Sequence, residues 1–168
     1  RGVNDHTALA LVEHFRGTGV IVRFIEYMDV GNRNEWRQDL VVPSAELAAR
    51  ISQRWPLAPA GRNYAGEVAE RQAFADGMGE VGFISSVSQP FCGDCSRARL
   101  SSDGTLYSCL FATTGVELRG PLRGGADDDT LLALLQSAWE RRADRYSEQR
   151  ASLHAGRERK VEMFHIGG

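Results

Sequence analysis

Apolar residues recur at helical spacing near the start of the chain and then occupy almost every position of the next segment. The spacing between Leu9 and Phe15 predicts a helix, which the turn at residues 17–19 (GTG) ends. Residues 20–28 (VIVRFIEYM) are rich in β-branched and aromatic side chains, so they predict a strand buried on both faces, as in a parallel sheet. The two segments form one αβ unit of an α/β fold, which is too little for a closed barrel.

The middle of the chain alternates polar turns with periodic segments. Residues 31–39 predict a loop, and residues 42–55 predict a helix whose N-terminus Ser44 caps. Residues 64–88 predict strands that turn at residues 75–79 (ADGMG).

The last third of the chain predicts a β-hairpin followed by a helix. Residues 97–111 (RARLSSDGTLYSCLF) have the pattern of a hairpin whose turn is Asp103–Gly104. Residues 127–146 predict an amphipathic helix, with acidic residues at its N-terminus and arginines toward its C-terminus, both favourable to the helix dipole.

Composition and charge narrow the class of protein without identifying it. The chain has 168 residues, 42% hydrophobic and 25% charged, which fits one ordinary domain or two small ones. A net charge of -2 argues against non-specific binding to nucleic acid or anionic membrane. No apolar run reaches the length of a membrane span, and the first residues lack the pattern of a signal peptide. Because there is no initiator methionine, we expect the chain to be part of a longer protein.

The three cysteines of the chain lie close together, as Cys92, Cys95 and Cys109 in a C-x2-C-x13-C pattern. A tight turn between the first two, with a permissive backbone at Gly93, would aim both sulfurs at one metal or cluster. The hairpin turn would reverse the chain and return Cys109 beside them. An odd, clustered set of cysteines without an export signal fits a metal in a reducing compartment, the cytoplasm, better than disulfides.

Three interpretations of these cysteines stay open on spacing alone. In the first, Cys109 is an ordinary buried residue and the other two cysteines form a structural turn. In the second, the thiolates bind zinc with His154 or His165 as the fourth ligand, although both histidines are distant in sequence. In the third, three thiolates hold an iron–sulfur cluster and leave one iron open to a substrate atom, which implies chemistry.

Two arginines directly behind the second cysteine bear on this choice. Arg97 and Arg99 alternate along the predicted strand, so their side chains would leave from the same face. Two guanidiniums beside an open metal site suit a phosphorylated or otherwise electron-rich ligand, which they can bind in bidentate geometry. The alternative is a solvated strand face whose arginines pair with carboxylates.

Residues 91–111 (FCGDCSRARLSSDGTLYSCLF) resemble the C-terminal cluster motif of the MoaA family, the radical S-adenosylmethionine GTP 3′,8-cyclases of molybdenum cofactor biosynthesis. The family pattern is F-C-x2-C-x-R-x-R-L, then a D-G turn and a C-L-F segment, and all of it is present. The resemblance extends over the whole chain, since residues 1–5 (RGVND) and 22–28 (VRFIEYM) are similar to late barrel segments. The final two glycines match the family's ending.

The resemblance also implies a fold and a domain organisation. Residues 1–40 would be the last part of an incomplete radical-SAM (β/α) barrel, and residues 41–168 an α+β C-terminal domain that carries an iron–sulfur cluster and binds GTP. The family's N-terminal C-x3-C-x2-C motif, which holds a second 4Fe–4S cluster, is not in this sequence. We therefore expect the chain to be the C-terminal half of such an enzyme and to be inactive alone.

By the resemblance, the three cysteines hold an auxiliary 4Fe–4S cluster whose open iron binds the guanine of GTP. The segment Arg97, Ala98 and Arg99 would line the GTP site. Arg23 corresponds to a barrel arginine that contacts the substrate, with a salt-bridged strand arginine as the alternative.

The resemblance assigns roles to three further residues. Met28 corresponds to a position that contacts S-adenosylmethionine, and the alternative is a core methionine. Gly167 and Gly168 resemble a mobile tail that reaches into the active site, and the alternative is a frayed terminus.

In the full enzyme the resemblance implies conversion of GTP to (8S)-3′,8-cyclo-7,8-dihydroguanosine 5′-triphosphate. A 5′-deoxyadenosyl radical, made from S-adenosylmethionine at the missing cluster, would abstract a ribose hydrogen, and this chain would contribute binding and orientation. Cyclic pyranopterin monophosphate synthase would receive the product. A homodimer is left open. We expect no nucleic-acid or membrane partner. The alternatives are a cysteine-ligated metal-binding module and the auxiliary-cluster domain of another radical enzyme.

Overall fold

The computed structural model describes residues 1–153 and 160–166, which form a mixed α/β structure with two sheets. The chain divides into two compact units. Unit 1 comprises residues 1–28 and 36–95, and unit 2 comprises residues 29–35 and 96–168. These two units are not the two domains predicted from the resemblance, residues 1–40 and 41–168. That domain boundary stays a prediction.

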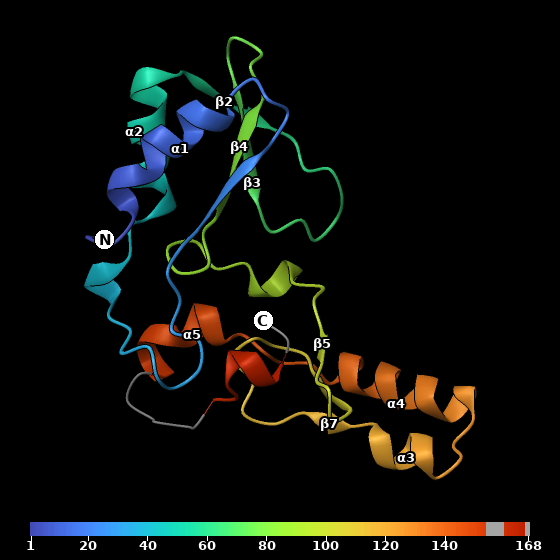
Figure 1. Ribbon diagram of the computed structural model, residues 1–168. Helices are drawn as coiled ribbons and strands as arrows, with labels where there is room; N and C mark the ends of the chain where they lie inside the picture. The colour runs from blue at the N-terminus through green and yellow to red at the C-terminus, as the bar shows by residue number, and fades with distance from the viewer. Residues whose placement is uncertain (154–159, 167–168) are drawn as a thin grey trace. The chain divides into compact units, whose positions relative to one another are not determined.

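Unit 1 is a four-stranded sheet accompanied by two α-helices (Figure 1). The strand order is β1-β4-β3-β2, in which β1 and β4 are parallel and the other pairs are antiparallel. In chain order its α-helices and strands are α1 (Ala8–Phe15), β1 (Val22–Ile25), α2 (Ser44–Arg54), β2 (Leu57–Ala60), β3 (Glu70–Phe74) and β4 (Glu80–Ile84). Short 3-10 turns lie at Asp5–Thr7, Gln38–Leu40 and Cys92–Asp94.

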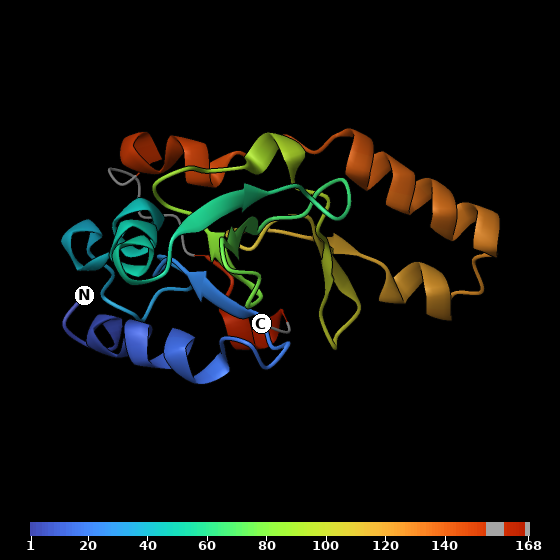
Figure 2. The ribbon, with the colours of Figure 1, turned by 90° about the horizontal axis from the view of Figure 1, so that it is seen from above.

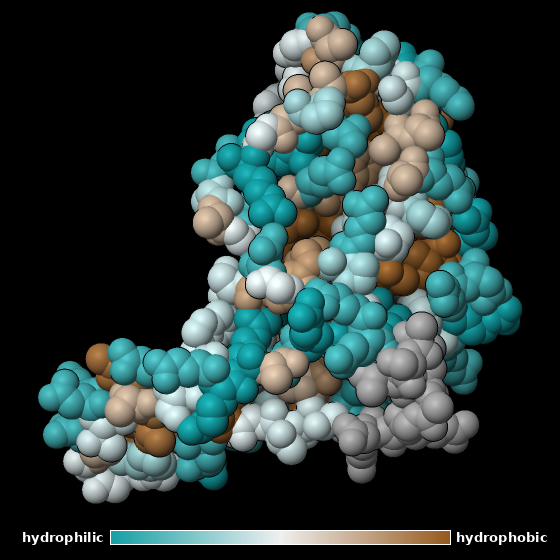
Figure 3. All heavy atoms as spheres, turned by 180° about the vertical axis from the view of Figure 1, so that it is seen from behind, coloured by the Kyte–Doolittle hydropathy of each residue, from teal (hydrophilic) through white to brown (hydrophobic). Residues whose placement is uncertain are grey.

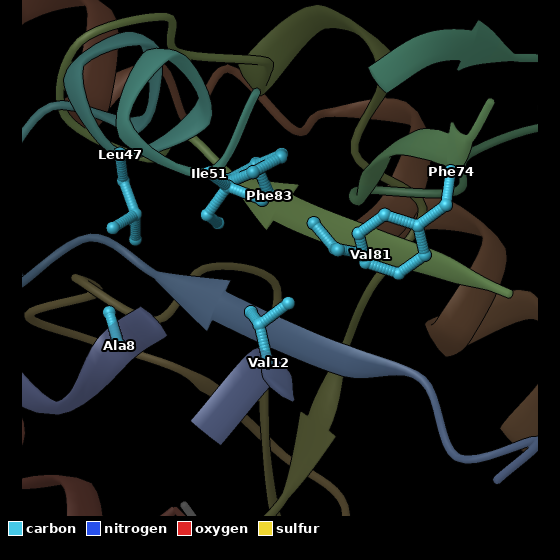
Figure 4. Packing of buried hydrophobic residues seen from close by; sticks show 7 residues of the cluster. All are labelled: Ala8, Val12, Leu47, Ile51, Phe74, Val81 and Phe83. Carbon is cyan, nitrogen blue, oxygen red and sulfur yellow. The ribbon is translucent and has the colours of Figure 1, made fainter. Parts of the chain in front are cut away.

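The core of unit 1 lies between the two helices and the sheet. Apolar residues spaced four apart, such as Leu47 and Ile51 on α2, place their side chains on one helical face. Figure 4 shows them pointing toward Val12 of α1 and toward Val81 and Phe83 of β4. All five side chains are buried, so removal of apolar area from water stabilises this packing.

The predicted strand at residues 20–28 is confirmed in type and in its parallel pairing, but not in its burial. β1 covers only four residues, and its side chains alternate between half-buried and exposed positions. Ile25, for example, is 59% exposed. The expectation of burial on both faces was wrong because only the face that carries Phe24 packs against the core, while Arg23 and Ile25 on the other face are exposed. Apolar composition alone does not show how many faces are covered.

The helix predicted at residues 42–55 is confirmed, whereas its predicted cap is not. α2 begins at Ser44, whose side chain makes no capping hydrogen bond. Instead the backbone N–H of Ser44 donates to Oε1 of Glu26 at 2.7 Å. A carboxylate from the end of β1 therefore replaces the local cap at this helix N-terminus.

In its described residues, unit 2 contains a three-stranded antiparallel sheet in the order β5-β6-β7 and three α-helices. Figure 1 and Figure 2 both show α3 and α4 side by side. In chain order the elements are β5 (Arg99–Leu100), β6 (Thr105–Tyr107), β7 (Val116–Glu117), α3 (Arg119–Arg123), α4 (Asp128–Glu140) and α5 (Tyr146–Leu153), followed by a 3-10 turn at Met163–His165.

The hairpin predicted in unit 2 is confirmed, and the helix predicted at residues 127–146 is confirmed in type, but α4 ends at Glu140, before the arginines that were expected near its C-terminus. β5 and β6 form the hairpin, and its turn requires glycine at Gly104, where φ is +85° and a Cβ would lie 2.8 Å from Cβ of Arg119. Asp127 caps α4, because its side chain accepts the N–H of Thr130 at 2.9 Å. The apolar face of α4 is not buried, however: Leu132 is exposed, and Figure 3 shows apolar residues among the polar ones of this part of the surface.

Residues 29–35 join unit 2 through contacts with residues 160–162. Asn32 donates from Nδ2 to the carbonyl of Lys160 at 2.7 Å and accepts the N–H of Lys160 at 3.0 Å. Gly31 lies so close to Glu162 that a Cβ would collide with the carboxylate, and its φ is +64°. This segment, which the sequence predicts only as a loop, is thus anchored by long-range hydrogen bonds.

Over the part of the chain that the structure covers, no helix combines the length and apolarity needed to cross a membrane.

Candidate functional site

The first two predicted cysteine ligands lie in unit 1, at the 3-10 turn Cys92–Asp94. The backbone N–H of Cys95 donates to the carbonyl of Cys92 at 3.3 Å, which closes the turn. Neither cysteine forms a disulfide, and both are half-buried. The predicted need for a permissive backbone at Gly93 is wrong, since its φ is not positive and a Cβ there would meet no atom within 4 Å.

The third cysteine, Cys109, follows β6 in unit 2, is also half-buried and forms no disulfide. Its Sγ accepts the backbone N–H of Phe111 at 3.4 Å. The ring of Phe111 stacks on Tyr146 with centroids 4.5 Å apart. This sulfur therefore has an oriented N–H donor, the kind of hydrogen bond that tunes thiolate ligands of iron–sulfur clusters.

The three cysteines have the chemistry to bind a metal or an iron–sulfur cluster as thiolates. Among the described residues, however, no three His, Cys, Asp or Glu side chains are arranged to hold a metal ion. Three cysteines outside disulfides offer soft thiolate ligands, which select iron–sulfur clusters or zinc. Of the histidines considered for zinc, His165 has Nε2 3.4 Å from Oδ2 of Asp103, and His154 lies outside the described residues.

The predicted GTP-binding segment lies at the start of unit 2. Only Arg99 belongs to a strand, where it is half-buried and pairs with Tyr107. Arg97 and Ala98 are exposed and precede β5. The prediction that the two arginines alternate on one strand face is therefore wrong, because the strand pairing of β5 begins only at Arg99.

Arg23 and Met28, the barrel residues that the resemblance assigns, are both in unit 1. Arg23 is the second residue of β1, with its side chain 44% exposed and its Nη2 3.8 Å from Oε1 of Glu67. Met28 is half-buried and follows the end of β1. Gly167 and Gly168 lie outside the described residues.

Glu26 is a buried residue whose structural role the sequence patterns do not predict. Its buried carboxylate accepts the backbone N–H groups of Ser44, Val87 and Ser88 at 2.7–2.8 Å and the Ser88 hydroxyl at 2.6 Å. Burial alone would raise the pKa of Glu26, but these hydrogen bonds together lower it below its ordinary value. The carboxylate thereby anchors the loop that leads from β4 toward Cys92. A lone acidic residue inside the apolar run of residues 20–28 is the signal that could have found it.

A second buried carboxylate, Asp29, organises unit 2. It accepts hydrogen bonds from Nε of Arg150 at 2.9 Å, Nζ of Lys160 at 2.9 Å and the hydroxyl of Tyr146 at 2.5 Å. Burial opposes ionisation, yet these donors hold the pKa of Asp29 below its ordinary value. Burial, and then the hydrogen bond and charge of Asp29, raise the pKa of Tyr146 far above its usual range.

Unit 1 also contains a pocket of about 380 Å³ beside the turn that carries the first two cysteines. Its lining combines polar and apolar residues and includes Glu67, Arg71, Gln89, Phe91 and Asp94. The volume is in the range of small-molecule sites. Sequence reasoning did not anticipate this pocket, because its walls come from segments far apart in the chain.

These features define a mixed α/β chain with three cysteines outside disulfides and arginines next to them in sequence. Comparison with protein families shows that the chain belongs to the Molybdenum Cofactor Synthesis C family, whose pattern matches residues 20–148. The family expected from the cysteine motif is thereby confirmed.

Relatives with names agree with this family. The chain is 60% identical over 168 residues to a GTP 3′,8-cyclase of Xanthomonas campestris pv. campestris (strain B100), covering 100% of this chain and 49% of the relative. It is 47% identical over 193 residues to a GTP 3′,8-cyclase of Acidothermus cellulolyticus, covering 100% of this chain and 53% of that protein. A third GTP 3′,8-cyclase, from Synechococcus sp. (strain CC9605), is 46% identical over 173 residues, covering 100% of this chain and 47% of its own length. The chain thus spans about half the length of the curated relatives it matches.

Proposed function

We propose that this chain is the C-terminal half of a GTP 3′,8-cyclase of molybdenum cofactor biosynthesis. The observation that carries the proposal is the 60% identity over 168 residues to a relative of that name. Three cysteines outside disulfides support it, because they have the spacing of the family's cluster motif and are followed by arginines in the sequence.

Within this proposal the three cysteines hold an auxiliary 4Fe–4S cluster, because free thiolates are the donors that such clusters require. When bound, the cluster supplies an iron with an open coordination position for the guanine of GTP. Arg23, Arg97 and Arg99 bind the charged groups of the nucleotide, since planar guanidiniums match phosphate oxygens in bidentate geometry. Ala98 lines the same site, and the chain orients the ribose and base for reaction.

The remaining assignments complete the enzyme. Residues 1–40 form the end of the radical-SAM barrel and residues 41–168 the C-terminal domain, while S-adenosylmethionine and a second 4Fe–4S cluster belong to the full-length protein. Met28 contacts S-adenosylmethionine, and the Gly167–Gly168 tail enters the reaction site, because residues without Cβ fit a narrow approach. Cyclic pyranopterin monophosphate synthase takes up the product, and a cytoplasmic location keeps the thiols reduced.

Metal and sulfide analysis of the intact protein, reconstituted anaerobically, tests this proposal. Two cubanes give about eight iron and eight sulfide per chain, and changing all three cysteines to serine should leave about four of each. Stoichiometric zinc without sulfide would contradict the auxiliary cluster and favour a metal-binding module. Two intact clusters without conversion of GTP, in the presence of S-adenosylmethionine and a reductant, would contradict the cyclase.

A further inference from the structure

Glu67 is a buried carboxylate whose two oxygens differ in their hydrogen bonding. Its side chain is 1% exposed, and Oε2 accepts the backbone N–H of Asn63 at 2.7 Å. Oε1 is equally buried and accepts no hydrogen bond from the residues that the structure describes. A buried carboxylate that lacks a donor destabilises the folded state, so this oxygen needs an explanation.

Arg23 brings a positive charge to this oxygen but leaves the pair incomplete. Its Nη2 lies 3.8 Å from Oε1 of Glu67, which is close enough for Coulomb attraction and too long for a hydrogen bond. The Arg23 side chain is 44% exposed, so it is accessible to a ligand from solvent. Because a guanidinium has five N–H donors in a rigid fork, it can bind Glu67 with one side and a second anion with another.

The sheet directs Arg23 toward Glu67. In the parallel pair of β1 and β4, Arg23 stands opposite Gly82. A Cβ on Gly82 would lie 3.2 Å from Cγ of Arg23 and 3.5 Å from Cβ of Ala69. The missing side chain at Gly82 therefore makes room for the stem of Arg23 to cross β4 toward the segment that carries Ala69 and Glu67.

A neighbouring arginine shows the contrasting arrangement. Arg71 pairs with Gly82 from the other side, on β3, and donates to both oxygens of Glu80 at 2.9 and 2.5 Å. Its Nη1 donates to two further oxygens, and its side chain is only 17% exposed. Arg71 is thus engaged within the protein, whereas Arg23 combines a buried counter-charge with exposure to solvent.

We infer that Glu67 is a positioning residue, which orients the Arg23 guanidinium to bind a negatively charged oxygen of the nucleotide. The inference rests on the proposed function, in which Arg23 contacts GTP. The buried carboxylate fixes one side of the fork, and the exposed N–H groups are left to bind the ligand. Glu67 acts through Arg23 and does not touch the substrate.

A purely structural role for Glu67 would be to fix its own loop through the N–H of Asn63. Glu67→Gln separates the two roles, because the amide keeps an acceptor for Asn63 and loses the charge that orients Arg23. Glu13→Gln is a matched control, since Glu13 also pairs with an arginine, Arg54, but both side chains are exposed on the helices of unit 1.

The experiment is a double-mutant cycle on GTP affinity in the intact protein, measured by equilibrium dialysis without S-adenosylmethionine so that no turnover occurs. Glu67→Gln and Arg23→Ala should each weaken GTP binding about tenfold, the effect of losing one charge-assisted hydrogen bond. Because both act through one guanidinium, the double variant should bind GTP no more weakly than Arg23→Ala alone. Glu13→Gln should bind like the wild type.

Unchanged affinity of Glu67→Gln or of Arg23→Ala, or additive losses in the double variant, would overturn the inference. Arg23→Lys is a second measurement that changes no buried group. A point charge on a flexible stem cannot bridge two anions as a planar fork does, so affinity should again fall about tenfold, and wild-type affinity would refute the bridge. Failure of the intact wild-type protein to bind GTP would instead overturn the proposed function, and the inference with it.

Discussion

Replacing Asp29 by asparagine should destabilise the protein far more than loss of an ordinary ion pair. Its side chain is 6% exposed, and the carboxylate accepts hydrogen bonds from Arg150, Lys160 and Tyr146. Asparagine has the same shape but carries no charge and presents an amide N–H₂ where the carboxylate accepts. The variant would therefore leave two largely buried cations without their counter-charge.

The expected loss in the free energy of unfolding follows from the cost of a buried charge without a counter-charge. Breaking a buried ion pair by removing one partner costs about 3–5 kcal/mol. With a urea m-value of about 2 kcal/mol per M, the unfolding midpoint should fall by about 1.5–2.5 M. The assay is urea unfolding of the intact protein, followed by far-UV circular dichroism.

A surface pair provides the control for Asp29. Asp39→Asn removes the partner of Arg37, where the two side chains are 61% and 67% exposed. Solvent screens that pair, so the urea midpoint of Asp39→Asn should stay close to that of the wild type. Equal shifts for Asp29→Asn and Asp39→Asn would refute the reasoning from burial.

The same carboxylate predicts a dependence of stability on pH. The pKa of Asp29 is lower in the folded protein than its ordinary value. Its contribution is therefore fully present above the unfolded pKa of about 3.9 and is lost as the pH falls through the lower folded value. The difference in midpoint between wild type and Asp29→Asn should be full at pH 7 and shrink below about pH 4. A constant difference down to pH 3 would contradict this account.

Three further predictions concern the proposed enzyme in its intact form. Arg97→Ala and Arg99→Ala should leave the iron content unchanged and each weaken GTP binding about tenfold in equilibrium dialysis; unchanged affinity would make them ordinary surface arginines. Glu26→Ala leaves three backbone N–H groups without their acceptor and should lower the free energy of unfolding by about 2–3 kcal/mol in urea denaturation; a wild-type midpoint would argue against its anchoring role. Removal of Gly167 and Gly168 should abolish or severely reduce cyclisation while iron content and unfolding midpoint stay unchanged; normal turnover would show that the tail takes no part in the reaction.

Several parts of this protein were determined by the sequence because the interactions that specify them are local. The apolar spacing of Leu47 and Ile51 predicts α2, and Asp103–Gly104 predicts the hairpin turn, since each depends on residues a few positions apart. The motif at residues 91–111 likewise predicted the family without any knowledge of the fold, because it is a pattern of residues close together in sequence.

Other features were decided only by the tertiary structure, because they join residues that the chain must bring together from far apart. Glu26 contacts Ser88 across 62 positions, and Asp29 contacts Arg150 across 121. Nothing in the sequence near these carboxylates indicates which of the many possible donors each will accept. Likewise Gly82 stands opposite Arg23 only because β1 and β4 pair in one particular register. Local patterns specify which side chains are available, and the long-range pairing of the backbone decides which of them meet.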